Sequence, residues 1–327
     1  MKEIIADLRA ENSRLDRYIA SAFGRISIAQ AQKLIRQKNI RLNGKHPPLN
    51  ARVHQGDAVR LYVPDELLAP PEKKPDPFYA AFRWKLSIVY EDEHLLLVDK
   101  RPGLLCHADR NEKVNSLIHH VRAYLYQTGA WDPAVSPFAP SLCNRIDRFT
   151  GGIVIAAKTR EALAAVNQKI RDHEIRKLYL CIVHGRMPSA HGTLSGYLAK
   201  TPGGRRVQVL AQCVPGAQSA LTSYRTLSQR DGLSLLECEL FTGRTHQIRA
   251  QLAACGHPLL GDGQYGSADE CRAFQALYAY CIRFAFTSDA GPLASLNGRR
   301  FQVRSVPFVK EYFPDFAAEQ GGSPHEA

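Results

Sequence analysis

Apolar residues recur at helical spacing in two short stretches near the N-terminus, and each stretch predicts an amphipathic helix. The first apolar face consists of Leu15, Tyr18, Ile19 and Ala22. Ser13 is expected to cap this helix and Gly24 to end it, because these residue types are common at those positions. Ser27 is expected to cap the second helix. The inward face of that helix is predicted to consist of Ile28, Ala31, Leu34 and Ile35.

Alternating stretches after these helices predict strands over residues 40–42 and 58–63. Asn43-Gly44 is a strong signal for a tight turn after the first of them. Residues 64–84 contain five prolines, so this segment is predicted to be an exposed linker. The predicted organisation is a small domain, a linker, a larger domain and a flexible tail, at 13–63, 64–84, 85–315 and 316–327.

The larger domain begins with two apolar runs around a charged turn over residues 88–100, which predicts a hairpin. Further along, a strand is expected to end near Thr242. Thr245 is expected to cap the following helix, which should run to about Cys255, with Gly256 as its stop. Strand-like and helical segments alternate irregularly throughout this domain.

The net charge indicates what kind of partner the protein binds. The formal net charge is +12, and such an excess points to a polyanionic partner, most often nucleic acid. Residues 13–63 hold ten basic and two acidic residues, a net of +8 in about a sixth of the chain. A merely solvated surface would spread its charge more evenly, so the clustering favours a nucleic-acid-binding unit.

The cysteines indicate the compartment. Eight cysteines without a C-x-x-C pair predict reduced, buried thiols of a cytoplasmic protein rather than disulfides or a zinc site. No signal-peptide stretch and no run of about 18 apolar residues is present, so no membrane span is expected.

Residues 14–17, 31–36 and 40–45 resemble the S4 RNA-binding module. The resemblance implies that the second helix and the loop after it present a set of cations to RNA phosphates. These cations are Arg25, Lys33, Arg36, Lys38 and Lys45. Phosphate contacts provide affinity and position but little sequence choice. The module also occurs in synthetases and ribosomal proteins, so it implies RNA binding without fixing an activity.

Two stretches of the larger domain carry candidate chemistry. Asp147 lies between Arg145 and Arg148, and from this stretch alone it is as well explained as an ion-paired turn residue. Arg244 and Arg249 lie before and in the helix after Thr242, where neither is forced into the core and a cation suits a bound anion.

Two histidines in the same region are also conspicuous. His246 and His257 lie near the ends of that helix, and we interpret them as local hydrogen-bonding residues. Their spacing supplies no third ligand for a metal ion.

Four ordered motifs closely resemble the RluA-type pseudouridine synthases, over most of residues 86–310. The motifs lie at residues 91–104, 144–152, 177–179 and 243–262. The resemblance implies an α+β catalytic domain on a mixed, mainly antiparallel sheet, behind a small α/β S4 domain, in a monomer. It also implies an isomerase that cuts the N1–C1′ bond of a uridine in RNA, turns the uracil and rejoins it through C5. No cofactor and no metal are expected.

The resemblance assigns the chemistry to three residues. Asp147 would attack C1′ or stabilise the cationic sugar, a task that suits a carboxylate. Arg249 would hold this carboxylate ionised through a bidentate pair. Tyr179 would stack on the uracil and act in proton transfer, although by itself it reads as a half-buried strand aromatic. Glycoside hydrolases use two carboxylates, whereas an isomerase that retains the base needs one.

Three further residues are assigned to substrate binding. Arg145 would help displace the target base, because a uridine inside a helix must be flipped out before C1′ is reachable. Ile248 would pack against the base, with ordinary core packing as the equal alternative. Asn144 stands where this family most often has histidine, and Gly151 stands where it often has serine. These departures leave the nucleophile untouched and bear on base flipping or target choice.

The sequence alone does not determine the target RNA. The S4 module favours large-subunit (23S) ribosomal RNA or a pre-ribosomal particle, by analogy with the family. One alternative is the same reaction on transfer RNA. The other is a non-catalytic RNA-binding or ribosome-assembly factor on the same scaffold.

Overall fold

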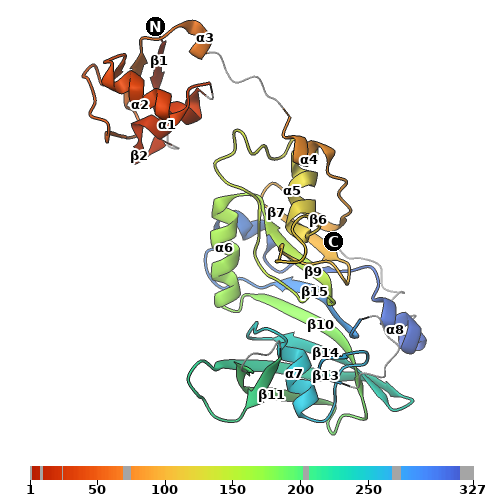
Figure 1. The fold of residues 1–327 in the computed structure, drawn as a ribbon. Coiled ribbons are helices and arrows are strands. Elements are labelled where there is room, and N and C mark those ends of the chain that lie inside the picture. The colour runs from red at the N-terminus through yellow and green to blue at the C-terminus, as the bar shows by residue number, and fades with distance from the viewer. Residues whose placement is uncertain are drawn as a thin grey trace. The chain divides into compact units, whose positions relative to one another are not determined.

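The chain forms two compact units that divide between Asp76 and Pro77 (Figure 1). The computed structural model describes residues 2–7, 10–23, 25–68, 75–201, 206–266 and 274–316. From residue 317 onward, the predicted flexible tail lies outside the described residues. None of the described helices has the length and apolar character needed to cross a membrane.

The first unit packs short helices against a small antiparallel sheet. Its helices are α1 (Leu15–Ala22), α2 (Ile28–Arg36) and α3 (Asp65–Leu68). Its strands are β1 (Lys2–Ile5), β2 (Ser13–Arg14), β3 (Ile40–Leu42), β4 (Arg52–Val53) and β5 (Ala58–Leu61). The sheet has the order β1-β5-β3, and β2 pairs with β4. The pairing of β1 with β5 extends this unit N-terminally beyond the predicted start at residue 13.

Capping in this unit is partly as predicted. The Ser27 hydroxyl accepts a hydrogen bond from the backbone N–H of Gln30, and the Gln30 side chain accepts one from Ser27 N–H, which confirms the cap of α2. The cap predicted at Ser13 is wrong, because Ser13 pairs with Val53 in a strand and Arg14 precedes the helix. Ile28 does not face inward, since 46% of it is exposed. Gly24 lies outside the described residues.

The charged surface of the first unit agrees with the RNA-binding prediction. All five predicted RNA-contacting cations are exposed, namely Arg25, Lys33, Arg36, Lys38 and Lys45. The tight turn at Asn43-Gly44 is confirmed, since both residues have a positive φ, 49° and 77°.

The second unit is built on an 11-stranded sheet with the order β12-β11-β13-β14-β10-β15-β9-β7-β6, with β16 beside β15 and β8 beside β9. Among the described strands, β9 and β15 pair in parallel and all other neighbours are antiparallel. This confirms the predicted mixed, mainly antiparallel α+β fold.

The strands of this sheet are β6 (Ser87–Glu91), β7 (Leu95–Lys100), β8 (Ser141–Leu142), β9 (Gly151–Ala157), β10 (Ile175–His184), β11 (His191–Lys200), β12 (Val207–Leu210), β13 (Gln218–Arg230), β14 (Leu233–Leu240), β15 (Leu277–Phe284) and β16 (Arg300–Gln302). The helices are α4 (Pro77–Ala81), α5 (Leu117–Gln127), α6 (Arg160–Arg171), α7 (Gln247–Ala254), the 3-10 helix η2 (Gly291–Leu296) and α8 (Pro307–Tyr312). The predicted hairpin corresponds to β6 and β7.

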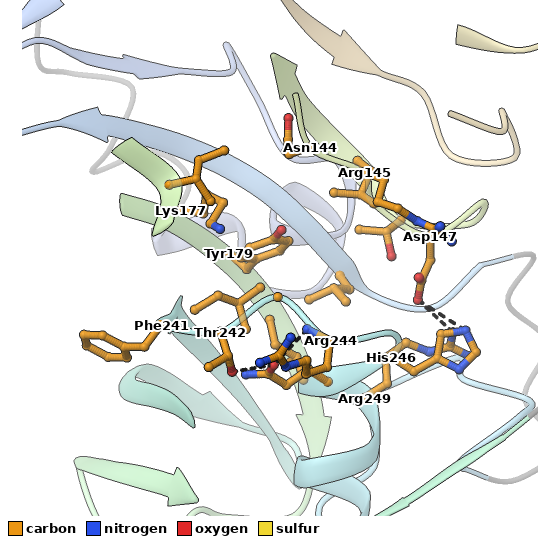
Figure 2. Close-up of a pocket in the computed structure, with 18 of the residues that line it drawn as sticks. Asn144, Arg145, Asp147, Lys177, Tyr179, Phe241, Thr242, Arg244, His246 and Arg249 are labelled. Atoms are coloured by element: carbon orange, nitrogen blue, oxygen red, sulfur yellow. Dashed lines mark hydrogen bonds and ion pairs between the residues drawn. The ribbon is translucent and has the colours of Figure 1, made fainter. Parts of the chain in front are cut away.

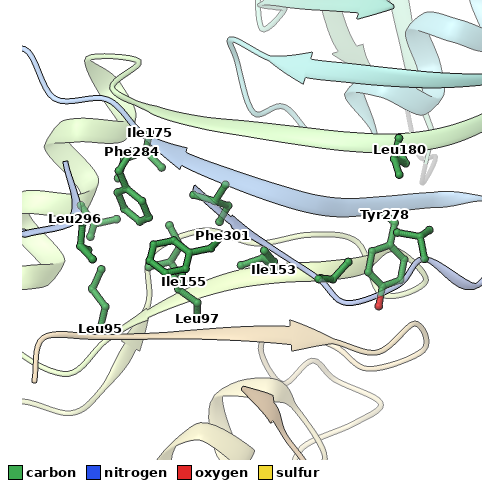
Figure 3. Packing of buried hydrophobic residues seen from close by; sticks show 14 of the residues in the cluster. Leu95, Leu97, Ile153, Ile155, Ile175, Leu180, Tyr278, Phe284, Leu296 and Phe301 are labelled. Atoms are coloured by element: carbon green, nitrogen blue, oxygen red, sulfur yellow. The ribbon is translucent and has the colours of Figure 1, made fainter. Parts of the chain in front are cut away.

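Both faces of this sheet are covered by apolar cores, because alternate side chains of a strand point to opposite faces. In β7, Leu95 and Leu97 belong to the core under α6, which Figure 3 shows. Leu96 and Val98 belong to the other core, under α5 and α7. The candidate catalytic side chains lie on this second face.

The predicted linker extends too far toward the C-terminus. Residues 77–81 form α4, and Pro77 suits the first position of a helix because its missing N–H has no partner there. The Gln127 side chain at the end of α5 donates hydrogen bonds to the carbonyls of Tyr79 and Phe82. Residues 77–82 therefore belong to the larger unit.

The cysteine prediction holds in part. The seven described cysteines are all free thiols, but Cys213 and Cys255 are exposed, so the prediction that the thiols are buried was wrong for these two. Cys271 lies outside the described residues.

Gly151, where the resemblance led us to expect a serine, has no room for a side chain. A Cβ atom on Gly151 would lie 2.2 Å from the ring of Tyr278, which stands opposite it in the β9–β15 pairing. This ring is buried, and its hydroxyl donates a hydrogen bond of 2.8 Å to Asp99. The tyrosine therefore occupies the space that a serine side chain would need.

We predict that Gly151→Ser lowers the free energy of unfolding by about 1–3 kcal/mol, because an overpacked site forces its neighbours to shift. Denaturant unfolding measures this change. Gly263→Ser is the control, since a Cβ atom there meets nothing within 4 Å. Equal stability of the two variants would contradict the packing explanation.

Candidate active site

A cavity of about 530 Å³ opens on the α5–α7 face of the larger unit (Figure 2). Its walls come from the loop before β9, from β10 and from the segment that leads into α7. The polar and charged residues among its lining include Asn144, Arg145, Asp147, Thr150, Arg171, His173, Lys177, Tyr179, Thr242, Arg244, His246, Gln247 and Arg249. Among the described residues that line it, Asp147 is the one carboxylate.

Asp147 lies in the loop that leads into β9, here named the catalytic loop (residues 144–150). Its carbonyl accepts a hydrogen bond from Thr150 N–H at 3.1 Å, which closes the turn before the strand. Its side chain is 25% exposed, and Oδ2 accepts a hydrogen bond of 3.0 Å from Arg249 Nη1. The other carboxylate oxygen, Oδ1, has no bond to Arg249.

Arg249 lies on α7 and is almost fully buried, so the prediction that it is not forced into the core was wrong. The bidentate pair predicted between Arg249 and Asp147 is wrong, because Arg249 forms its bidentate pair with Asp262. Arg249 Nε donates to Asp262 Oδ2 at 2.7 Å and Nη2 to Oδ1 at 2.9 Å. Nη2 also donates to Gln264 at 3.0 Å, and the guanidinium lies 5.1 Å from the ring centre of Tyr265.

Charge pairing keeps this buried network ionised. Burial works against the charge of Arg249, but the hydrogen bonds and charge of Asp262 outweigh it and raise the Arg249 pKa. Burial likewise opposes the charge of Asp262, and the bonds from Arg249 still lower its pKa. Arg249 is thus a fixed cation with one N–H group directed at Asp147.

Tyr179 projects from β10 into the cavity and is buried. The β10–β15 pairing is irregular at this position, between Leu178 and Leu180. Such bulges commonly redirect a side chain next to an active site. Burial, together with the charge of Asp147, raises the Tyr179 pKa far above its ordinary value, so the side chain is a neutral phenol.

The predicted substrate-binding residues lie in the same cavity but differ in character. Arg145 is exposed at its edge, and Ile248 is a buried apolar part of its wall that also belongs to the core. The Asn144 side chain is engaged by the protein itself, because its Oδ1 accepts a 2.8 Å hydrogen bond from Ile155 N–H. Asn144 therefore tethers the catalytic loop to β9.

His246 joins the site, which the sequence did not indicate. It precedes α7 in the left-handed conformation, with φ of 56°, so the cap predicted at Thr245 is wrong. Its Nε2 lies 3.7 Å from Asp147 Oδ2, and its Nδ1 lies 3.0 Å from the Tyr265 hydroxyl. His257 is not among the residues that line the cavity, and its Nδ1 lies 2.9 Å from the carbonyl of His184, so its partner is distant in sequence rather than local as interpreted.

Burial lowers the pKa of His246 and so favours the neutral imidazole. Its Nδ1 faces the Tyr265 hydroxyl, which also accepts a hydrogen bond of 2.9 Å from Val207 N–H. Its Nε2 is the ring nitrogen that faces Asp147.

Lys100 anchors the backbone of the catalytic loop. Only 1% of it is exposed, and its ammonium donates to the carbonyls of Leu104, Arg101 and Arg148 at 2.8, 3.1 and 3.1 Å. Because Arg148 follows Asp147, Lys100 fixes the backbone that carries the carboxylate. Burial lowers the Lys100 pKa to about 8.

No cluster of three or more His, Cys, Asp or Glu side chains in the described part of the chain is placed to hold a metal ion. The site thus consists of a carboxylate, a paired guanidinium, a neutral phenol and a neutral imidazole. Such a set can bind and polarise an electrophilic carbon.

Comparison with known proteins assigns the family. Residues 94–254 match the family model described as RNA pseudouridylate synthase, and residues 13–59 match the S4 domain. The chain is 32% identical over 292 residues to the ribosomal large subunit pseudouridine synthase D of Zymomonas mobilis, covering 87% of this chain and 85% of that protein. The chain belongs to the RNA pseudouridine synthases.

Other members of this family agree with the assignment. An uncharacterized RNA pseudouridine synthase of Synechocystis is 31% identical over 85% of this chain and 84% of its own length. The solved structure of human RNA pseudouridylate synthase domain containing 4 has a TM-score of 0.56 at 17% identity, over 73% of this chain and 95% of that one. This second likeness concerns the fold.

The site residues that were not predicted from the sequence position other residues of the site. Asp262 lies in the last motif, but its role is set by a contact with Arg249 that spans 13 residues of chain. Lys100 lies in the first motif, but its residue type did not indicate this role, and Tyr265 gave no signal beyond its residue type. The role of Lys100 depends on its burial, which is known only from the fold.

We predict that Asp262→Asn slows isomerisation on the order of 10²-fold, because Arg249 loses the pair that orients it. The same change should lower the free energy of unfolding by about 3–5 kcal/mol, since it leaves a buried cation without its main partner. Single-turnover release of tritium from RNA labelled at uridine C5 measures the rate. Gln264→Ala removes one neutral bond to Arg249 and should slow the reaction less than about tenfold. Equal effects would contradict the role given to the bidentate pair.

We predict that Lys100→Met slows the single-turnover reaction roughly 10- to 100-fold, with little change in RNA affinity, because the backbone at Asp147 loosens. Lys158→Met is the matched control. Lys158 bonds Glu91 and the carbonyl of Asp92 beyond the far end of β9, so its loss should leave the rate unchanged.

A second readout for Lys100 uses pH. Its pKa is about 8 in the folded protein against 10.5 for the free side chain, so the unfolded chain binds more protons in this window. Stability of the wild type should therefore rise from pH 8 to 10.5 relative to Lys100→Met. An identical pH dependence in both proteins would refute this assignment of Lys100.

Proposed function

We propose that this enzyme converts specific uridines of large-subunit ribosomal RNA to pseudouridine, with Asp147 as the nucleophile at C1′. The observation that carries the proposal is the lone Asp147 carboxylate, held by Arg249 in the cavity that also contains Tyr179. A hydrolase would need a second carboxylate there, to protonate the leaving group or activate water.

The residues suggest an order of events. The Asp147 carboxylate attacks C1′ as the N1–C1′ bond breaks, and the electron pair leaves with the uracil. The uracil turns until C5 faces C1′, and C5 then forms the new bond and displaces Asp147. C5 loses its proton and N1 gains one, so atoms and charge balance without an external reactant.

Arg249 and His246 prepare the carboxylate for this attack. Both face Oδ2, because Arg249 donates a hydrogen bond to this oxygen and His246 Nε2 lies 3.7 Å from it. This leaves Oδ1 as the oxygen without a bond from Arg249, and we assign the attack to it. Fixing one oxygen orients the other at little entropic cost during the reaction.

Tyr179 and Ile248 form apolar walls for the uracil. Both are buried and line the cavity, so a base between them is shielded from water. Since Tyr179 is a neutral phenol, its hydroxyl can shuttle a proton between C5 and N1 without holding a charge beside Asp147. Arg145, exposed at the edge, is placed to take the position of the flipped base in the RNA.

Ribosomal RNA is the favoured target for two reasons. The curated relative from Zymomonas mobilis is named a ribosomal large subunit pseudouridine synthase. The S4 unit adds five exposed cations, which suit the phosphates of a folded RNA. We further propose that the protein works as a cytoplasmic monomer, and its seven described free thiols agree with a reducing compartment.

We predict that Asp147→Asn abolishes pseudouridine formation, with a loss of at least about 10³-fold, while RNA affinity stays within a few fold. Pseudouridine mapping of cellular RNA with and without the gene identifies the target. Tritium release from a transcript of that region then measures the rate.

Asp132→Asn is the control, because Asp132 caps a loop after α5 and lies outside the cavity lining. An active Asp147→Asn enzyme would overturn the mechanism. A modified uridine in transfer RNA would overturn the proposed target but not the proposed reaction. Binding without any modified uridine would favour the non-catalytic factor.

A further inference from the structure

We propose that Phe149, Phe274 and Arg148 form a platform, here called the stacking platform, that stacks one unpaired base of the substrate RNA beside the catalytic cavity. The inference rests on the RNA-modifying function proposed above. It concerns a base other than the target uridine, because neither ring is among the residues that line the cavity of Asp147.

The two rings are unusually exposed for large apolar side chains that touch each other. Phe149 is 42% exposed and Phe274 is 37% exposed. Their ring centres lie 5.3 Å apart at an interplanar angle of 22°, and the guanidinium of Arg148 lies 5.4 Å from the centre of the Phe149 ring. Exposed apolar residues usually occur singly, whereas a paired set on a functional face marks a binding surface.

The fold fixes this pair relative to the nucleophile. Phe149 follows Asp147 by two residues, which limits their Cα separation to about 7 Å. Phe274 lies just before β15, and the adjacent Gln275 donates a buried hydrogen bond of 3.2 Å to Thr150. Stacked bases follow one another at about 3.4 Å, so the bound base lies within a few nucleotides of the target.

The charges around the platform favour a base over a phosphate on its rings. Arg145 is an exposed cation that can reach the RNA backbone, whereas the guanidinium of Arg148 lies over the Phe149 ring. Backbone hydrogen bonds lower the pKa of Asp109, and the charge of Arg148 lowers it further. The same two causes lower the pKa of Glu112. These two carboxylates would repel a phosphate next to Arg148, but a neutral base is not repelled.

The chemistry thus matches sites that bind single-stranded RNA, where aromatic rings carry bases and arginines neutralise phosphates. Such stacking tolerates any base, because every base has a flat π face. The platform therefore adds affinity for an unpaired segment next to the target, and it leaves sequence choice to other contacts.

The first test compares Phe149→Leu with Phe149→Trp in the full-length enzyme. Leucine keeps an apolar side chain but has no ring, whereas tryptophan keeps the stacking surface. We expect Phe149→Leu to raise KM for the transcript of the mapped target roughly 10- to 100-fold with kcat within twofold, and Phe149→Trp to stay near wild type. Phe274→Leu should behave as Phe149→Leu does.

Phe78→Leu is the matched control. Phe78 is 39% exposed and lies in another aromatic cluster, with Tyr79, Phe82 and His119, so its loss should leave KM unchanged. If Phe149→Leu instead lowers kcat and the melting temperature at constant KM, the rings serve only to hold the catalytic loop, and the proposal is overturned. An unchanged KM and kcat would overturn it as well.

A binding assay separates this proposal from the catalytic one. The probe is a 12-nucleotide single-stranded RNA that carries 2-aminopurine, whose fluorescence falls when it stacks. We expect wild type and Asp147→Asn to quench it, and Phe149→Leu to need roughly tenfold more protein for the same quenching. Equal quenching by wild type and Phe149→Leu would overturn the platform even if pseudouridine is formed. Unequal quenching without any pseudouridine would leave the platform standing and overturn the function.

Discussion

The site depends on one buried guanidinium, that of Arg249, which donates four hydrogen bonds. Arg249 is almost fully buried, and a buried cation is tolerated only when it is paired and hydrogen-bonded. Asp262 and Gln264 occupy Nε and Nη2, which leaves Nη1 to define where the Asp147 carboxylate must lie. The single hydrogen bond from Arg249 to Asp147 is thus positioned by the two bonds between Arg249 and Asp262.

The sheet supplies the rigid base for this arrangement. The catalytic loop runs into β9, and β9 pairs with β15, where Gly152 leaves no space for a Cβ atom against the backbone of Ala279. Lys100, at the end of the neighbouring β7, binds the carbonyl that follows Asp147. The loop is thus tied to two strands, whereas its contact with α7 is made by side chains alone.

Sequence patterns were sufficient for the architecture, and the residues they singled out for the site lie in one cavity, but the contacts among these residues could not be predicted. The S4 turn at Asn43-Gly44 and the cap at Ser27 depend on local geometry, which the sequence determines directly. The caps expected at Ser13 and Thr245 failed because strand pairing and the side-chain network of His246 override local preference. The pairing of Arg249 with Asp262, and the tether made by Asn144, arise from tertiary contacts that no spacing rule encodes.

The distance along the chain between the parts of the site has a consequence during synthesis. Asp147 and Arg249 are 102 residues apart, and the strand that supports the catalytic loop begins only at Leu277. At a translation rate of about 5–20 residues per second, roughly 7–26 s separate the emergence of Asp147 from that of β15. The S4 unit, built from the first 76 residues, emerges earlier still. A ribosome-bound chain can therefore fold its RNA-binding part before the site is assembled, and the Asp147 carboxylate acquires Arg249 only after a further 102 residues have been made.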